Sequence, residues 1–246
     1  MPSNWKRPAD VAFPQVWARC EGKTTLADGS KLVYRIQDAT PEMHEEIVDR
    51  LMMVYFVRDE DICKTINLMA DKTSMEDTRI MWKESLQQNV GLVAIREYPD
   101  GQEEIIGTNI TCVVSKGEKS NPDEVKGEAM RKIWRMLMED LPKQLDVFEH
   151  YGVDHYMSAV GLTVLPKYRG QNVGLEILRA RFQLVKGVGL KATATAFTAM
   201  ASQKQAQRAG YELLTEMVYN DYKVDGKVVF PGMTTPSVKY MGKYIP

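Results

Sequence analysis

The sequence predicts an α/β protein, and three patterns carry this prediction. Residues 156–165 are rich in apolar and β-branched residues, as in a buried strand, and an amphipathic helical segment, 175–186, follows after a short loop. Two strand-like runs, 90–98 and 103–114, flank a Pro-Asp-Gly turn and predict a β-hairpin. Apolar residues at helical spacing predict a helix over 40–56. The 246 residues are long enough to bury a substantial core, and a single domain, 1–246, is the simplest organisation because no repeat or linker interrupts them.

Composition and charge exclude several classes of protein. Hydrophobic residues make up 44% and charged residues 26% of the chain, which is typical of a soluble globular protein. Lys and Arg total 32 against 33 Asp and Glu, so we expect neither a nucleic acid nor a membrane as partner. The start of the chain lacks a secretory signal, and three cysteines without metal-like spacing suit a reducing compartment. We therefore expect a cytoplasmic protein without a bound metal.

The first part of the chain predicts a ribbon and a helix. Two short strands, 15–20 and 31–37, are separated by an Asp-Gly turn, and residues 1–30 are interpreted as an N-terminal extension. Thr40 followed by proline and glutamate predicts the start of a helix that ends near Phe56.

A second helix is expected over 73–89, where Ser74 and Asp77 approximate a capping box. After the hairpin, 115–123 is a polar loop, and another helix is expected to begin near Pro122. The many methionines could line a flexible pocket, but core packing is the preferred interpretation.

The last part of the chain alternates between strands and helices. Gly187-Val-Gly predicts the end of the helix that starts near 175. The remaining expected elements are a strand over 190–197, a helix over 200–209, strands within 212–223 and 224–230, and a last strand over 237–244.

The loop between strand 156–165 and its helix carries the first chemical signal. It reads Arg-Gly-Gln-Asn-Val-Gly over 169–174, and its small residues let backbone N–H groups meet an anion at the helix N-terminus. A pyrophosphate would fit there. Ordinary tight turns have the same composition, so the loop alone leaves both interpretations open.

This segment resembles the coenzyme A motif of the GNAT acetyltransferases. The family's loop pattern, Arg/Gln-x-x-Gly-x-Gly/Ala, maps onto Arg169, Asn172 and Gly174, and Asn172 takes the place of the first glycine. Asn tolerates positive φ better than most residues, which would preserve the loop. The resemblance implies that acetyl-CoA binds with its pantetheine along one strand and its pyrophosphate in the loop. The residues so implied are Leu162, Thr163 and Val164 in the strand, and Arg169, Gly170, Gln171, Asn172, Val173 and Gly174 in the loop.

An acidic cluster at 58–61 carries the second signal. Its text, Tyr-Phe-Val-Arg-Asp-Glu-Asp-Ile over 55–62, resembles the Phe-Lys-Asp-Glu-Pro-Leu segment of insect arylalkylamine N-acetyltransferases, whose glutamate is a general base. That glutamate corresponds to Glu60, with Asp59 and Asp61 as nearby alternatives. An amine must lose a proton before it attacks a thioester, and a carboxylate beside an apolar wall can accept it. Without the resemblance, a solvated helix end is the simpler interpretation.

A third segment, 201–212, is similar to the family's Ser-Ala-Arg-x-x-x-Lys-x-Gly-Phe text. In the insect enzymes, serines at the positions of Ser202 and Thr198 lie near the substrate and the coenzyme thiol, where a hydroxyl can bind the thioester or return a proton to the thiolate. Helix capping is the alternative role for Ser202. Residues 220–223 and 228–230 also resemble segments of the family's sequences.

The resemblance covers residues 32–243 and implies the GNAT fold, a mixed and mostly antiparallel sheet that is splayed at the cofactor strand and has helices on both faces. It implies transfer of an acetyl group from acetyl-CoA to an arylalkylamine of the dopamine, serotonin or tryptamine type by direct attack. The alternatives are a polyamine, agmatine or other small amine as acceptor, or a non-catalytic acyl-CoA sensor. An aromatic pocket would favour arylalkylamines and an acidic one polyamines. We expect a monomer, and the residues that could line its pocket are Tyr55, Phe56, Trp82, Trp134, Asp59 and Asp61.

Overall fold

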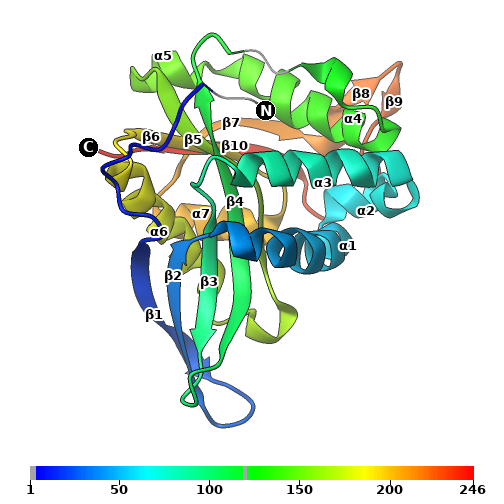
Figure 1. Cartoon of the computed structure of the whole chain (residues 1–246). Helices are drawn as coiled ribbons and strands as arrows, with labels where there is room; N and C mark the ends of the chain where they lie inside the picture. Colours follow the sequence, from blue (N-terminus) through cyan, green and yellow to red (C-terminus); the bar gives the residue numbers. More distant parts are fainter. Residues whose placement is uncertain (1–3, 119–120) are drawn as a thin grey trace.

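An eight-stranded sheet runs through the computed structural model, which describes residues 4–118 and 121–246. Its strand order is β1-β2-β3-β4-β5-β6-β10-β7, and every neighbouring pair is antiparallel except β5 and β6, which are parallel. This mixed, mostly antiparallel sheet confirms the predicted fold class (Figure 1). Residues 1–3 of the expected N-terminal extension and residues 119–120 of the expected polar loop lie outside the described residues.

The strands of this sheet are β1 (Val16–Thr25), β2 (Lys31–Asp38), β3 (Leu92–Glu97), β4 (Glu103–Ser115), β5 (His155–Val164), β6 (Ala192–Phe197), β7 (Glu212–Val218) and β10 (Ser237–Tyr244). A separate two-stranded ribbon holds β8 (Lys223–Val224) and β9 (Lys227–Val228). The predicted hairpin is the β3–β4 pair, which lies in the middle of the sheet.

The helical segments of the first half are η1 (Pro41–Met43), η2 (Glu46–Phe56), α1 (Val57–Asp59), α2 (Asp61–Thr65), η3 (Leu68–Ala70), α3 (Lys72–Leu86) and η4 (Pro122–Glu124). Those of the second half are α4 (Glu128–Trp134), η5 (Arg135–Asp140), η6 (Pro142–Gln144), α5 (Val147–Tyr151), η7 (Pro166–Tyr168), α6 (Val173–Gly187), α7 (Met200–Ala209) and η8 (Tyr219–Asp221).

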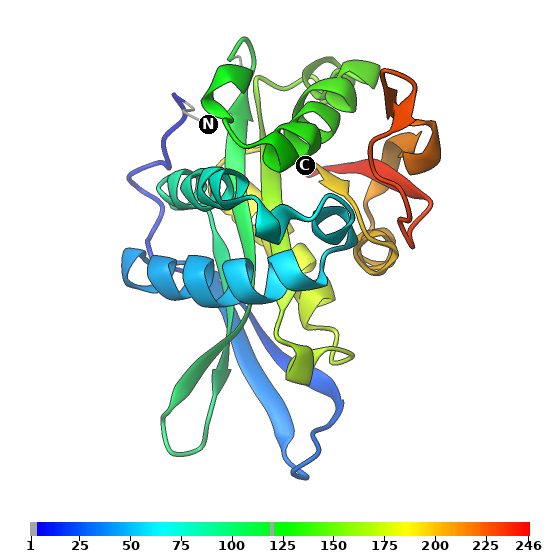
Figure 2. The same ribbon diagram turned by 90° about the vertical axis from the view of Figure 1, so that its right-hand side faces the viewer.

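Helices cover both faces of the sheet. In Figure 1, η2, α3 and α4 lie in front of the strands and α6 and α7 lie behind them, and Figure 2 shows the front layer from the side. The front helices bury apolar side chains such as Leu51 and Trp82 against the sheet, and α6 buries Ile177 and Leu184 from the other side. Burial of these faces is the main driving force for this arrangement.

Two helix starts differ from the prediction. The helix α3 is capped by Asp71, whose carboxylate accepts the N–H of Ser74 at 3.1 Å, so the predicted capping box of Ser74 and Asp77 is wrong. Asp77 instead accepts the N–H groups of Lys126 and Gly127 at the start of α4. Pro122 begins only the short η4, and α4 starts at Glu128 because these contacts fix its first turn there.

Among the residues that the structure describes, no helix is long and apolar enough to cross a membrane.

Candidate active site

A gap between β5 and β6 forms the centre of the site. The two strands pair at one position, Met157 with Thr193. Two hydroxyls of β6 reach across to carbonyl groups of β5: Thr193 Oγ1 donates to Met157 O at 2.8 Å, and Thr195 Oγ1 donates to Ala159 O at 2.9 Å. Side chains therefore replace ladder hydrogen bonds where the strands begin to diverge, and beyond Ala159 the edge of β5 is open.

The open edge of β5 offers backbone groups to a ligand. Leu165 N–H donates to Ile106 O at 2.9 Å, and the register places Thr163 opposite Thr108. Because antiparallel pairing alternates along a strand, Thr163 turns its N–H and C=O towards β4, whereas Leu162 and Val164 turn theirs towards the gap. Of the three predicted strand residues, the backbones of two are thus directed to the ligand side.

A β-bulge shapes β5 just before this edge. The register slips between Ile110 and Thr111, which leaves Val160 as the extra residue. Trp82 Nε1 donates to Val160 O at 2.9 Å, and Asn109 Nδ2 donates to Gly161 O at 2.8 Å. These two side chains hold the bulge in place from the face that η2 and α3 cover.

The loop 169–174 meets the geometric requirements of an anion site. Gly170 and Asn172 have φ values of 82° and 65°, in the left-handed region that glycine and asparagine tolerate best. Asn172 directly precedes the 15-residue helix α6, whose first N–H groups have no partner within the helix. Asn172 therefore has the left-handed backbone conformation expected for the glycine that it replaces in the motif.

Two side chains of this loop fix it to the rest of the molecule. Gln171 turns away from the cavity, where its Oε1 accepts Thr24 N–H at 2.9 Å and its Nε2 donates to Thr24 Oγ1 at 3.0 Å. Arg169 donates from Nε to Val164 O at 3.0 Å and from Nη2 to Asp59 at 2.5 Å. The second contact joins the loop to the acidic cluster.

The acidic cluster contains three carboxylates in very different surroundings. Hydrogen bonds from Arg58 and Arg169 lower the pKa of Asp59 to about 2. Hydrogen bonds from Thr234 and Lys64 lower the pKa of Asp61. Burial raises the pKa of Glu60, although its side chain keeps a partly exposed face on the cavity. Asp59 and Asp61 are thus held as paired anions, and Glu60 is the carboxylate best tuned to accept a proton.

Thr198 contacts Glu60 directly. Its Oγ1 donates to Glu60 Oε1 at 2.6 Å, and Tyr219 Oη donates to Thr198 O at 3.0 Å from the other side. Ser202 lies one turn into α7, where its Oγ donates to Ala199 O at 2.8 Å. Ser202 is therefore not the N-cap of α7, a position that Ala199 occupies.

A cavity of about 680 Å³ connects these parts, which is the size of a typical ligand pocket. Its wall contains every residue predicted for the site except Gln171. Phe56, Asp59, Trp82 and Trp134 also line it, whereas Tyr55 and Asp61 do not. The part of the wall formed by α3, α4, η5 and α5 is mostly apolar, with side chains from Met81, Trp82, Met130, Ile133, Trp134, Leu137, Met138 and Phe148.

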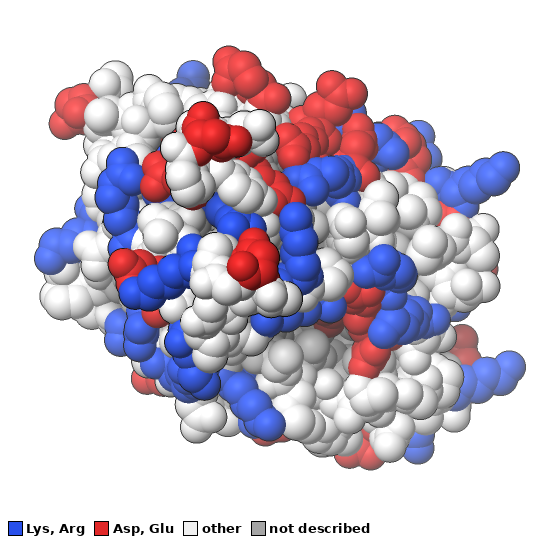
Figure 3. Space-filling view, turned by 90° about the horizontal axis from the view of Figure 1, so that it is seen from below, with Lys and Arg blue, Asp and Glu red and all other residues white. Residues whose placement is uncertain are grey.

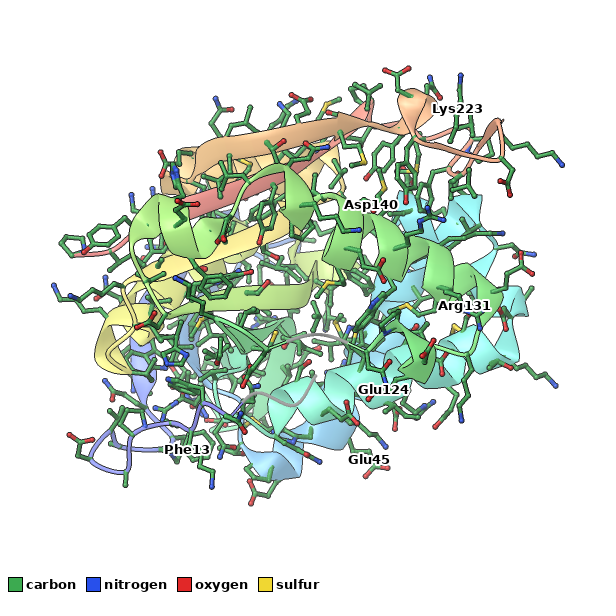
Figure 4. All side chains as sticks on the ribbon, turned by 90° about the horizontal axis from the view of Figure 1, so that it is seen from above. Phe13, Glu45, Glu124, Arg131, Asp140 and Lys223 are labelled. Atoms are coloured by element: carbon green, nitrogen blue, oxygen red, sulfur yellow. The ribbon has the colours of Figure 1, made fainter. Side chains whose placement is uncertain are left out.

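The elements that carry this wall are far apart in the chain but adjacent in space. Seen from above, the labelled residues Arg131 and Asp140 mark the course of α4 and η5 across the helical layer (Figure 4).

On the lower face, Lys and Arg side chains are interspersed with Asp and Glu (Figure 3). Both signs of charge are therefore exposed on this face.

Sequence patterns did not reveal several residues that shape the site. Tyr219 supports Thr198, and Asn109 supports the bulge, but neither stands in a recognisable pattern. The helix α5, which brings Phe148 to the cavity, was not expected, although Asp146 is a good capping residue: its carboxylate accepts the N–H of Phe148. The methionines Met81, Met130 and Met138 lie in the cavity wall as well as against the core, so both interpretations of these residues apply.

Solved structures of known proteins share this architecture. A protein of the yellow fever mosquito, assigned as arylalkylamine N-acetyltransferase 7, superimposes with a TM-score of 0.91 at 36% identity, over 99% of this chain and 100% of the other. Arylalkylamine N-acetyltransferase 2 of Aedes aegypti gives 0.75 at 19% identity, over 87% and 99%. The polyamine N-acetyltransferase of Drosophila melanogaster, which forms N-acetylagmatine, gives 0.69 at 17% identity, over 86% and 99%. Neither a protein-family model nor a curated protein matches the chain.

Proposed function

Because the chain belongs to the insect arylalkylamine N-acetyltransferases of the GNAT fold, we propose that it transfers the acetyl group of acetyl-CoA to the primary amine of an arylalkylamine. The family makes it an acetyltransferase that acts on amines. The class of amine, the identity of the acyl donor and the roles of single residues are what we propose beyond the family, and features of the cavity support each of them.

The observation that carries the proposal is an aromatic cavity with the buried carboxylate of Glu60 at its wall. Phe56, Trp82, Trp134 and Phe148 supply flat apolar surface on which an aromatic ring packs well. Glu60 lies in the same wall, and its raised pKa brings the carboxylate closer to the working range of a base at neutral pH. An arylalkylamine has the matching parts, a ring and an ammonium group joined by a short chain.

The donor is assigned to the other end of the cavity. The backbone groups of Leu162 and the N–H of Val164 suit the amides of a pantetheine arm, which would pair with β5 as an added strand does. The C=O of Val164 is held by Arg169 Nε. The first turn of α6, with Asn172 and Gly174 at its entrance, suits the pyrophosphate. The residues present thus fit the pantetheine arm and the pyrophosphate of acetyl-CoA.

In the proposed reaction, Glu60 accepts a proton from the ammonium group, directly or through water. The neutral amine then attacks the acetyl carbonyl, the C–N bond forms, and the C–S bond breaks with release of the thiolate. Thr198 orients Glu60 through its hydrogen bond. Ser202, which lines the same cavity, turns its hydroxyl away from Ala199 O and passes to the leaving sulfur the second proton, which the attacking nitrogen loses as the amide forms. No covalent acyl-enzyme is needed, so both substrates must be bound together.

An agmatine or polyamine acceptor is the second candidate, because agmatine and polyamine N-acetyltransferases share the fold at TM-scores of 0.69. A polyamine carries a second cation and needs a second carboxylate. Besides Glu60, the described part of the cavity wall holds two carboxylates: Asp59, which is paired with Arg58 and Arg169, and Glu118, which accepts the N–H of Asn4. The apolar wall therefore favours the arylalkylamine. The cytoplasmic location and the monomeric state remain predictions from the sequence.

The test is thiol release from acetyl-CoA with dopamine, tyramine, serotonin, tryptamine, agmatine, putrescine and spermidine as acceptors. We expect turnover with the aromatic amines, and a kcat/KM for them well above that for agmatine and spermidine. A preference for agmatine or spermidine would contradict the aromatic acceptor. Acetyl-CoA binding without turnover on any amine would favour the non-catalytic sensor.

A further inference from the structure

Two indole groups lie in the cavity wall, and their N–H groups are used differently. Trp82 Nε1 donates to Val160 O at 2.9 Å and so belongs to the support of the bulge. Trp134 is 6% exposed, and its Nε1 has no hydrogen-bond acceptor among residues 4–118 and 121–246. A buried N–H group without an acceptor carries its full desolvation cost, so an acceptor for Trp134 should come from outside the described chain.

Several polar groups near Trp134 already have partners among the described residues. The hydroxyls of Tyr156 and Tyr240 lie 3.2 Å apart and bond to each other. Thr78 Oγ1 donates to Ser74 O at 2.6 Å. Elsewhere in the wall, Arg181 Nε and Nη1 and Asn109 Oδ1 also lack partners among the described residues, but Arg181 comes from α6 behind the sheet and Asn109 from β4. Trp134 is an unpaired donor on the apolar α3–α4 side of the cavity, where the ring of an arylalkylamine would pack.

The surroundings of Trp134 allow a ligand to approach. Trp134 is the last residue of α4, next to the wide turns of η5, and α4 packs against α3 on the same face of the sheet. The neighbouring wall carries Met81, Met130 and Met138, whose unbranched side chains adjust to a new shape at low cost. Trp134 Nε1 is itself covered, so an oxygen on an aromatic ring reaches it when neighbouring side chains shift, which methionines permit.

We propose that Trp134 Nε1 donates a hydrogen bond to an oxygen on the aromatic ring of the acceptor. The ammonium group lies at Glu60, and the ring lies against the apolar wall with its oxygen at the indole. Trp134 is then a specificity residue that selects phenolic, catecholic or hydroxyindole amines over the same amines without a ring oxygen. This inference rests on the proposed function, because it places an arylalkylamine in the cavity.

The test compares matched acceptors in matched variants. The ratio of kcat/KM is measured for tyramine over phenylethylamine and for serotonin over tryptamine, in the unaltered protein, in Trp134→Phe and in Trp82→Phe. We expect Trp134→Phe to lower both ratios about five- to tenfold, the effect of one neutral hydrogen bond. Trp82→Phe removes an indole N–H from the same wall but should lower activity on both members of each pair alike.

A second measurement needs no variant. A methoxy group keeps the acceptor oxygen of the ring but cannot donate, so 5-methoxytryptamine should retain the preference over tryptamine, whereas 5-methyltryptamine should not. Equal turnover of oxygenated and plain amines, or ratios that Trp134→Phe leaves unchanged, would overturn the role of Trp134 and leave the proposed function intact. Turnover of agmatine with none of the aromatic amines would overturn both.

Discussion

The two ends of the cavity are built in opposite ways. The donor end comes from one stretch of chain, β5, the loop 169–174 and the start of α6, and it consists mainly of backbone groups. The acceptor end is assembled from η2, α3, α4, α5 and the segment after β6, and it consists of side chains. The comparison indicates that the donor end should tolerate changes of side chain that keep the backbone shape, whereas the acceptor end should respond to the loss of single chemical groups.

The largest effect is expected from Glu60→Gln, which removes the base and keeps the shape of the side chain. We predict a loss of about 10²–10⁴ in kcat with acetyl-CoA affinity largely retained, because general bases contribute on that scale. Steady-state kinetics and a binding titration with acetyl-CoA measure the two parts. Asp61→Asn is the control, since Asp61 lies outside the cavity wall and is paired with Lys64. Full activity of Glu60→Gln across the pH range would reject Glu60 as the base.

The next effect sharpens the comparison at the donor end. Asn172→Val places a β-branched residue at a φ of 65°, which is strained, and we predict a rise in KM for acetyl-CoA of about tenfold or more with kcat less affected. Asn172→Gly keeps the backbone conformation and should stay within about threefold of the unaltered protein. If Asn172→Gly were as impaired as Asn172→Val, the side chain of Asn172 rather than its backbone would be what matters.

A smaller effect concerns the pH profile. Glu60 must be unprotonated to act, so activity is lost as the pH falls through its pKa, which burial places above the usual range for glutamate. The hydrogen bond from Thr198 opposes this shift, and its removal in Thr198→Val should move the acid limb of kcat/KM to higher pH and lower activity at pH 7 about three- to tenfold. Thr198→Ser keeps the donor and should leave the limb in place. A limb that moves to lower pH in Thr198→Val would contradict this account.

The smallest kinetic effect is expected from Gln171→Ala, although Gln171 lies within the loop. Its two hydrogen bonds go to Thr24 on β1, so their loss should lower the melting temperature by about 2–4 °C. We expect KM for acetyl-CoA to change by less than about threefold, as thermal unfolding and initial rates would show. A large rise in KM with no change in melting temperature would place the side chain in the cavity instead.

The contrast between a contiguous donor end and a dispersed acceptor end also explains which parts of the structure could be predicted from the sequence. The bounds of the strand and the helix within 156–187 were predicted to within two or three residues of those in the structure. A strand, a loop and a helix that follow one another in the chain give a local sequence pattern that can be recognised. The hairpin over 90–114 and the helix over 200–209 were predicted for the same reason.

The acceptor end was predicted only in part. Glu60, Thr198 and Ser202 were found through family resemblance and do line one cavity. Tyr219 and Asn109 were not found, because a hydrogen bond to a backbone carbonyl far away in the chain has no local signature. Gln171 was placed in the loop correctly, but the direction of its side chain depends on Thr24, 147 residues away.

The hydroxyls of Thr193 and Thr195 have a consequence for the energetics of binding. Where two strands diverge, the carbonyl groups between them normally lose their hydrogen-bond partners. The free energy of the chain then favours a return of the strands to full pairing. Here the carbonyl groups of Met157 and Ala159 are already satisfied by side chains of the neighbouring strand. The gap between β5 and β6 is therefore open before a ligand arrives, and little of the binding free energy is consumed in reorganising the two strands.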